Sequence, residues 1–226
     1  MVYITGDTHR DARLPDIAEF CFEYETTEDD VIVILGDVGI NFYGEQDDRY
    51  WKEELCGVPV TLLCIHGNHE DRPENITTYE EADWKGGTVY CEPEFPNLLF
   101  AKDGEIYELE GYRCLAIGGA YSVDGSGWPD EQPSEETKEY VERQIESAEY
   151  RIDVVFSHTC PYKHIPEDAF LPGVNESTVD RSTEYWLDTI ENRLNNPTWY
   201  CGHFHIDRFE ANLRFVYREF LELEDY

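Results

Sequence analysis

Residues 62–71 read LLCIHGNHED, an apolar run that ends abruptly in Gly67-Asn68-His69. A short and continuous apolar run is typical of a strand that is buried on both faces of a sheet. The polar residues that follow it are either an ordinary turn or a site held at the end of the strand. The rest of the chain favours the second interpretation.

The same kind of apolar run recurs along the chain and predicts further strands. The predicted strands are Val2–Thr5, Val31–Leu35, Thr61–Ile65, Cys114–Ile117, Val154–Ser157 and Trp199–Cys201. Apolar spacing predicts helices over 14–24, over 134–148 with Ser134 as N-cap, and over 182–194 with Ser182 or Thr183 as N-cap. Closely spaced strands at 88–90, 98–100 and 106–109 indicate antiparallel pairing, and 213–221 suggests one more strand. This alternation predicts a layered α/β fold with mixed sheets, as one domain over residues 1–226.

Composition sets the class of protein and its partners only broadly. The chain has 50 acidic and 17 basic residues, for a net charge of -33, which disfavours long nucleic acids and anionic membranes. The seven cysteines form no CxxC pair, which favours a reducing compartment. No run approaches the ~18 apolar residues of a membrane span, and the first residues show no signal peptide. We therefore expect a cytoplasmic protein with no membrane partner; the sequence leaves the oligomeric state open.

Potential metal ligands follow five of the predicted strands. They are Asp7, His9, Asp37, Asn68, His158, His203 and His205, with His69 beside Asn68. Each residue alone is more often part of a turn, but independent turns would seldom place five of the seven histidines directly after apolar runs. Side chains at the carboxyl ends of neighbouring strands meet in one crevice.

The ligand types indicate the class of metal. Imidazole nitrogens mixed with carboxylate and amide oxygens suit first-row ions such as Mn²⁺, Fe, Zn²⁺ or Co²⁺. Seven ligands exceed the need of one ion, whereas two ions that share a carboxylate fit the count. Two such ions, ~3.5–4 Å apart, are the usual arrangement for phosphoester hydrolysis, with a hydroxide held between them.

The ordered motifs DxH, GD, GNHE, H and GHxH span residues 7 to 205 and resemble those of the calcineurin-like metallophosphoesterase family. The resemblance implies an αββα sandwich of two mixed sheets flanked by helices, with a dinuclear site at the strand ends. It implies two divalent ions, with manganese favoured and iron, zinc, cobalt or nickel as alternatives. Asp7, His9, Asp37 and His205 would hold one ion, and a bridging Asp37 with Asn68, His158 and His203 the other. His69 would protonate the leaving oxygen or stabilise the transition state.

Two departures from the family pattern affect His69 and the assignment to a branch. Ile40 stands where many members carry the second Asp of GDxxD, which orients the catalytic histidine; Glu70 or Asp71 are the candidates to replace it. His66 stands where protein Ser/Thr phosphatases carry Arg, which argues against that branch. The predicted activity is hydrolysis of a small phosphodiester, or of a phosphomonoester on a metabolite or phosphoprotein. The alternative is a catalytically weak scaffold that binds a partner.

Other residues leave two interpretations open. The stretch 118–122 either brings backbone close to the site or is a plain turn, and Arg10 is either a phosphate ligand or a surface residue. Aromatic residues between 121 and 140 either stack on a substrate ring or form a packed lid. We expect His66 and His164 to be structural or surface residues.

Overall fold

The computed structural model describes residues 1–9, 13–42, 44–123, 129–170 and 178–224, which form two sheets between two pairs of helices. The first sheet has the strand order β13-β1-β2-β3-β6-β5-β4. Its strands are β1 (Val2–Thr5), β2 (Val31–Ile34), β3 (Thr61–Cys64), β4 (Glu80–Trp84), β5 (Gly87–Cys91), β6 (Leu98–Ala101) and β13 (Leu221–Glu222). Strands β1, β2, β3 and β6 run parallel, and the outer strands pair antiparallel.

The second sheet has the order β11-β12-β10-β9-β8-β7. Its strands are β7 (Ile106–Leu109), β8 (Tyr112–Ile117), β9 (Val154–Ser157), β10 (Thr198–Cys201), β11 (Arg208–Glu210) and β12 (Leu213–Phe215). The central strands β8, β9, β10 and β12 are parallel, and β7 and β11 pair antiparallel at the two edges. The prediction of mixed sheets is confirmed.

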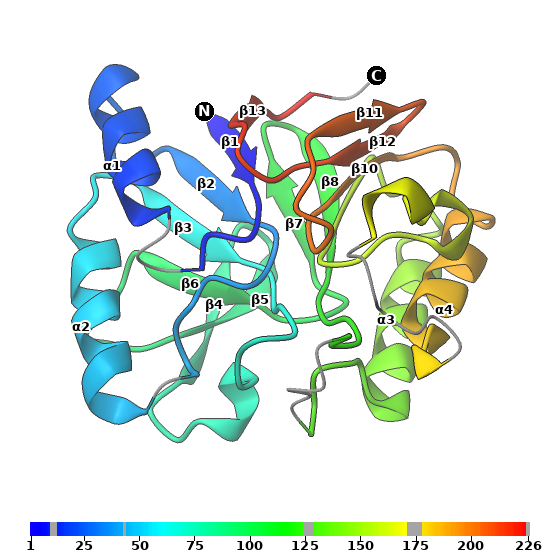
Figure 1. Cartoon of the computed structure of the whole chain (residues 1–226), viewed down its shortest axis with the longest axis horizontal. Helices are drawn as coiled ribbons and strands as arrows, with labels where there is room; N and C mark the ends of the chain where they lie inside the picture. Colours follow the sequence, from blue (N-terminus) through cyan, green and yellow to red (C-terminus); the bar gives the residue numbers. More distant parts are fainter. Residues whose placement is uncertain (10–12, 43, 124–128, 171–177, 225–226) are drawn as a thin grey trace.

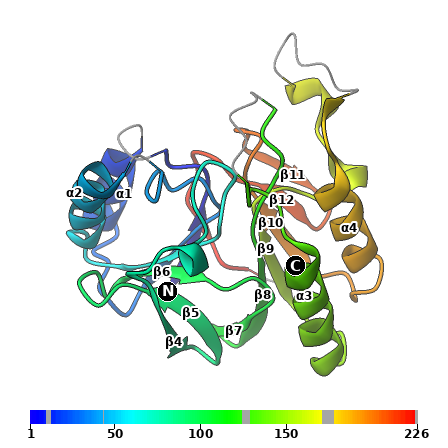
Figure 2. The ribbon, with the colours of Figure 1, turned by 90° about the horizontal axis from the view of Figure 1, so that it is seen from below.

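Helices cover the outer face of each sheet. Figure 1 shows α1 (Leu14–Glu23) and α2 (Glu45–Cys56) beside the first sheet, and α3 (Glu135–Ser147) and α4 (Ser182–Glu191) beside the second. Figure 2, turned by 90°, shows the same separation. The layers are therefore helix, sheet, sheet and helix, as the family resemblance implies. Among the described residues, no helix has the length and apolar character needed to cross a membrane.

The hydrophobic core follows the two-residue period of the buried strands. Val33 and Leu63 pack between the two sheets, with Phe156 of the second sheet, whereas Ile32 and Ile34 pack against the helices. Successive side chains of a strand point to opposite faces, so a strand covered on both faces must be apolar throughout. This explains why β2 and β3 read as continuous apolar runs.

Three sequence predictions of elements need correction or confirmation. Ser134 caps α3 as predicted, because its Oγ accepts from the Thr137 N–H at 3.1 Å. Neither Ser182 nor Thr183 caps α4, because the helix already includes both and its N-cap is Arg181; it also ends at Glu191, before Leu194. The single strand predicted over 213–221 is instead β12 and β13, which belong to different sheets.

The acid-rich helix α2 and the exposed edge strand β4 are absent from the sequence prediction. Helix α2 reads EQDDRYWKEELC, with too few apolar residues to show a helical stripe. One of its buried side chains is Lys52, which pairs with Glu92 at 2.5 Å. A pairing of this kind depends on the fold and leaves no apolar signal.

Candidate metal centre

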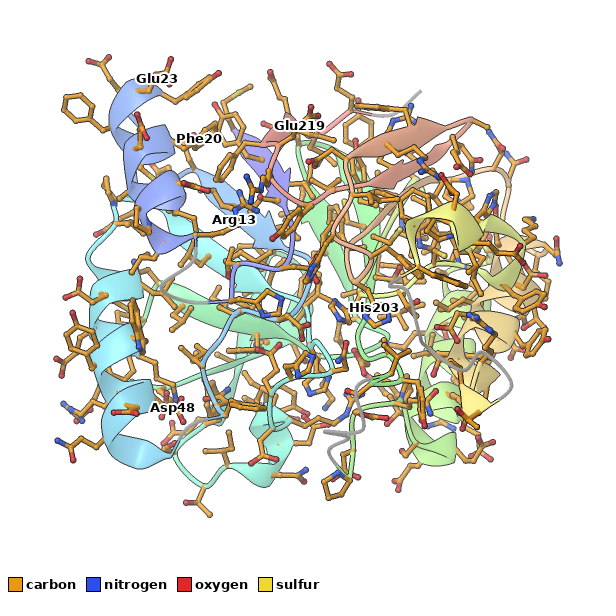
Figure 3. The ribbon with its side chains drawn as sticks, in the orientation of Figure 1. Arg13, Phe20, Glu23, Asp48, His203 and Glu219 are labelled. Atoms are coloured by element: carbon orange, nitrogen blue, oxygen red, sulfur yellow. The ribbon has the colours of Figure 1, made fainter. Side chains whose placement is uncertain are left out.

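The candidate ligands lie together at the carboxyl ends of parallel strands from both sheets. In the first sheet, Asp7 and His9 follow β1, Asp37 follows β2, and Asn68 follows β3; in the second, His158 follows β9, and His203 and His205 follow β10. Figure 3 places His203 near the middle of the molecule, between the half with α1 and α2 and the half with α3 and α4. The predicted convergence of strand ends is confirmed. Ligation itself stays a prediction.

One group of possible ligand atoms comes from Asp7, His9 and His205, and these atoms lie within 4.8 Å of one another. The two imidazole Nε2 atoms of His9 and His205 are 3.0 Å apart, and His205 Nε2 is 3.6 Å from Asp7 Oδ1. These three residues belong to the set expected to hold one ion.

A second group comes from Asp7, Asp37 and His158, again within 4.8 Å. Asp37 Oδ2 lies 3.6 Å from His158 Nε2 and 3.9 Å from His9 Nε2, between one ring of each group, which suits the bridging position. His203 packs against this group, with its ring centroid 5.0 Å from that of His158. Asp7 therefore belongs to both groups, whereas the family resemblance places it with one ion only.

A cation fits beside the second group because two hydrogen-bond acceptors, on His158 and Asn68, face each other there. His158 Nδ1 donates to the Leu35 carbonyl oxygen at 2.7 Å, so the neutral ring presents an unprotonated Nε2. That atom is 2.8 Å from Asn68 Oδ1. Asn68 Nδ2 donates to Ser122 Oγ at 2.9 Å, which turns its oxygen toward His158. A divalent cation satisfies such a pair of lone-pair donors.

Five of the seven candidate ligands have backbone torsions in the left-handed region. The φ angles are 43° at Asp7, 44° at His9, 49° at Asp37, 67° at His203 and 53° at His205. Non-glycine residues seldom adopt this conformation, and each instance costs of order 1–3 kcal/mol. The surrounding fold holds the chain in this conformation, which turns the side chains back over the strand ends.

The glycines that precede the ligands are required by close approach between the strand ends. A Cβ on Gly67 would lie 2.1 Å from Asp37 Oδ1, and one on Gly202 would lie 2.5 Å from Asp7 Oδ2. A Cβ on Gly36 would lie 2.1 Å from His158 Nδ1. Each glycine thus makes room for a candidate ligand from another strand, so the glycines of the three motifs have a packing role.

Backbone N–H groups hold the two buried carboxylates. Asp37 Oδ1 accepts from the N–H groups of Asn68 and His69, both at 2.9 Å, which leaves Oδ2 toward the imidazoles. Asp7 accepts from the His203 N–H, at 3.0 Å to Oδ1 and 2.9 Å to Oδ2. These bonds join the ends of different strands through the site.

The four imidazoles among the candidate ligands have lowered pKa values. Burial lowers the pKa of His203 to about 3, with His158 adding to the effect, and lowers that of His205 to about 4, with His9 adding to it. Burial also lowers the pKa of His9 and that of His158, although Asp37 opposes both shifts. The rings are therefore neutral at pH 7, which is the form that binds metals.

The two carboxylates have opposite shifts. Burial raises the pKa of Asp7 well above its ordinary value, and the neighbouring Asp37 raises it further. Burial also acts to raise the pKa of Asp37, but His158, His9 and His69 outweigh it, and the net direction is down. A buried carboxylate with a raised pKa lacks compensating charge, which a bound cation provides.

His69 lies on the wall of the same site and is half-buried. Its ring centroid is 6.1 Å from that of His9 and 6.2 Å from that of Phe42. Ile40 is fully buried among apolar side chains. In the part of the chain that the structure describes, no carboxylate is hydrogen-bonded to the His69 ring.

The Glu70 side chain is occupied elsewhere, so it does not replace the missing Asp. Glu70 Oε1 accepts from the Gly67 N–H at 2.7 Å, and Oε2 accepts from the Val38 N–H at 3.2 Å. Glu70 therefore joins the loop after β3 to the loop after β2, and burial, followed by Asp37, raises its pKa well above the usual value. Asp71 lines a different cavity from the one that His69 lines.

The other sequence candidates divide clearly. His66 is buried, with Nε2 3.0 Å from the Glu70 carbonyl oxygen, and His164 pairs with Glu191 at 3.1 Å, so both are structural as expected. The stretch 118–122 reaches the site through the Ser122 side chain, whose Oγ accepts from Asn68 Nδ2; the approach of its backbone stays a prediction. The place of Ser122 after a strand is the one sequence signal for this contact. Arg10 lies outside the described residues.

A cavity of about 320 Å³ opens beside the candidate ligands. Asp37, Asn68, His69, His203 and His205 line one side of it. The remaining lining residues are Tyr121, Val123, Ala169, Phe170, Val179, Arg181, Glu184 and Phe204. The cavity is large enough for a small ligand.

Comparison with known proteins identifies the family. The model of the calcineurin-like phosphoesterase family matches residues 1–207. No curated protein matches the chain. The crystal structure of TT1561 of Thermus thermophilus covers 96% of this chain and 87% of its own, with a TM-score of 0.54 and 13% identity. A second crystal structure covers 95% of this chain and 88% of its own, with a TM-score of 0.53 and 16% identity. At these identities the two structures show a shared fold, and the family match agrees with the site geometry. The chain belongs to the calcineurin-like phosphoesterase family.

Proposed function

We propose that the protein is a metal-dependent hydrolase of small phosphoesters, either phosphomonoesters or small phosphodiesters. The observation that supports this best is the pair of ligand groups that share Asp7, beside a cavity of about 320 Å³. A phosphoprotein side chain is a further possible monoester substrate, and the net charge of -33 disfavours a long nucleic acid.

Seven residues would hold two divalent cations. Asp7, His9, Asp37 and His205 would hold one, and Asp37, Asn68, His158 and His203 the other. Cations bound here would supply Lewis acidity to the phosphoryl group and neutralise the charge that develops on its oxygens. The mixture of imidazole and oxygen ligands supports Mn²⁺ as the first candidate, with iron, zinc, cobalt or nickel as alternatives.

His69 is the proposed acid for the leaving oxygen. Its backbone N–H donates to Asp37 Oδ1 at 2.9 Å, while its ring lines the cavity. This position supports a role for His69 as a proton donor beside the ligand groups that is not itself a ligand. From the same position, His69 could instead stabilise the negative charge of the transition state.

The alternative is a catalytically weak scaffold, which the absence of an orienting acid supports. Within the described residues, nothing fills the place of the missing Asp at Ile40, and Glu70 holds two loops together instead. The complete set of candidate ligands argues against the scaffold, because a protein that only binds a partner has no chemical reason to keep it. Turnover in added metal separates the two functions.

The test is hydrolysis of p-nitrophenyl phosphate and of its bis-ester, side by side in Mn²⁺. Asp37→Asn should abolish turnover through loss of metal, whereas Asp83→Asn, the same change at an exposed position of β4, should not alter it. The ratio of the two esters assigns the enzyme as mono- or diesterase. Metal-loaded protein that hydrolyses neither ester would favour the scaffold.

The compartment is also a proposal. All seven cysteines are free; five are buried, and Cys56 and Cys91 are half-buried. Thiols without disulfides support a cytoplasmic protein, as the sequence suggested.

A further inference from the structure

The cavity beside the candidate metal centre has a second wall with a different chemistry. Three segments build it: the loop after β8, the turn that ends in Phe170, and the start of α4. This wall is mainly apolar, with Tyr121, Val123, Phe170 and Val179 among its side chains. The cavity thus pairs a polar side for a phosphoryl group with an apolar side for the rest of the substrate. Its volume of about 320 Å³ suits a phosphoryl group and one ring-sized substituent.

Phe204 supplies a fixed aromatic surface to this wall. Its ring stands edge-on to His203, with centroids 5.0 Å apart, and edge-on to Phe215 at 5.7 Å. Phe204 is therefore held from two sides and stays half-buried at the cavity. Aromatic side chains with an exposed face favour contact with the ring of a ligand.

Arg181 brings positive charge to the same wall. Among the described residues that line the cavity, it is the one lysine or arginine. Its guanidinium carbon lies 5.3 Å from the centroid of the Phe170 ring, so the ring supports the charged group. No salt bridge or hydrogen bond joins the guanidinium to any described residue, although the chain has 50 acidic residues.

Glu184, another described residue that lines this cavity, forms no salt bridge or hydrogen bond with Arg181. Glu184 is buried, and one carboxyl oxygen accepts from Thr159 Oγ1 at 3.0 Å. Burial raises the pKa of Glu184 and outweighs the opposing charge of Arg181. Asp180, beside Arg181 in the chain, bonds to the Ser182 N–H and to Gln132. Among the residues that the structure describes, none takes up the five donors of the guanidinium, whose planar fork suits a planar anion.

We propose that the cavity takes a phosphoester whose alcohol part is an aromatic ring bearing an anionic group, and that Arg181 is the specificity-determining residue that binds this anion. The ring packs against Phe170 and Phe204, and the phosphoryl group lies at the ligand side of the cavity. This inference rests on the proposed phosphoesterase function and names its substrate class.

Three phosphomonoesters with similar leaving alcohols test the proposal: ethyl, benzyl and para-carboxybenzyl phosphate. For the metal-loaded protein we expect kcat/KM to rise about tenfold from ethyl to benzyl, and about tenfold or more again for the carboxylate, since a charged hydrogen bond discriminates by at least that factor. Arg181→Gln should bring the ratio of carboxybenzyl to benzyl close to one, mainly through KM, and Arg181→Lys should restore part of it. Phe170→Ala should reduce the ratio of benzyl to ethyl.

Arg193→Gln is the matched control, because Arg193 follows the other end of α4 and pairs with Glu142 at 2.6 Å. It should leave both ratios unchanged. Equal kcat/KM for the three esters, or an Arg181→Gln variant that lowers all three equally, would overturn the proposal while the phosphoesterase function stands. Metal-loaded protein that hydrolyses p-nitrophenyl phosphate or its bis-ester but none of the three would overturn this inference alone, whereas protein that hydrolyses none of the five esters would overturn the function as well.

Discussion

Replacing Gly67 with alanine tests whether the close approach of strand ends builds the site. The added Cβ would lie 2.2 Å from the Asp37 backbone nitrogen and 2.9 Å from its Cα, whereas ordinary contacts begin at 3.4 Å. The loops after β2 and β3 must therefore separate by about 1.2 Å, which far exceeds the ~0.2 Å that metal–ligand distances tolerate. The nearest atom, Asp37 Oδ1, belongs to a side chain, but the next two are backbone, so a movement of the Asp37 side chain alone cannot relieve the clash.

We expect Gly67→Ala to lower affinity for Mn²⁺ by about 100-fold or more, since outer-shell changes alone cost 10–100-fold. The overpacked loop should also lower the free energy of unfolding by about 1–3 kcal/mol. Calorimetric titration with Mn²⁺ and urea unfolding measure the two effects.

Gly111→Ala is the control for backbone strain. Gly111 has a φ of 89°, and a Cβ there meets nothing within 4 Å. The variant should lose about 1–2 kcal/mol of stability from the left-handed backbone and keep its metal affinity. Gly67→Ala protein that binds Mn²⁺ and turns over substrate as the wild type does would refute the packing argument.

Three more variants probe single interactions. His69→Gln should lower kcat by about 10²–10⁴-fold with metal affinity retained, as expected for a lost general acid; unchanged kcat would exclude that role. Ser122→Ala frees the amide of Asn68 and should weaken metal binding by about 10–100-fold in the same titration, and wild-type affinity would show that the orientation is unimportant. Burial, with Arg72 adding to it, lowers the pKa of His66 well below its ordinary value, so the unfolded chain binds the extra proton below pH ~6.5 and stability falls as the pH falls. With the metal removed by a chelator, His66→Gln should reduce the slope of the free energy of unfolding against pH by up to about 1.4 kcal/mol per pH unit. Equal slopes for the variant and the wild type would contradict the assignment.

The strand ends are predictable from sequence because their signal is local. A buried parallel strand reads as a continuous apolar run, and the polar residue after it must lie at the sheet edge. Asp37, Asn68 and His158 were found in this way. The order of their motifs also indicated the family, which the match over residues 1–207 confirms.

Contacts that form only in the tertiary structure could not be predicted from the sequence. Glu70 looked in sequence like a neighbour for His69, yet it bonds to the N–H groups of Gly67 and Val38. Ser122 orients Asn68 from 54 residues away, and no pattern in either segment shows it. Helix α2 was missed because Lys52 fills a buried position by pairing with an acid.

The central claim is that two divalent cations at this site make the chain a phosphoesterase. The most direct measurement is activity on the preferred p-nitrophenyl ester after chelation and stepwise return of Mn²⁺, with bound metal counted at each step. The account predicts no turnover without metal and full turnover at two ions per chain. Turnover in the metal-free protein, or two bound ions without turnover, would contradict it.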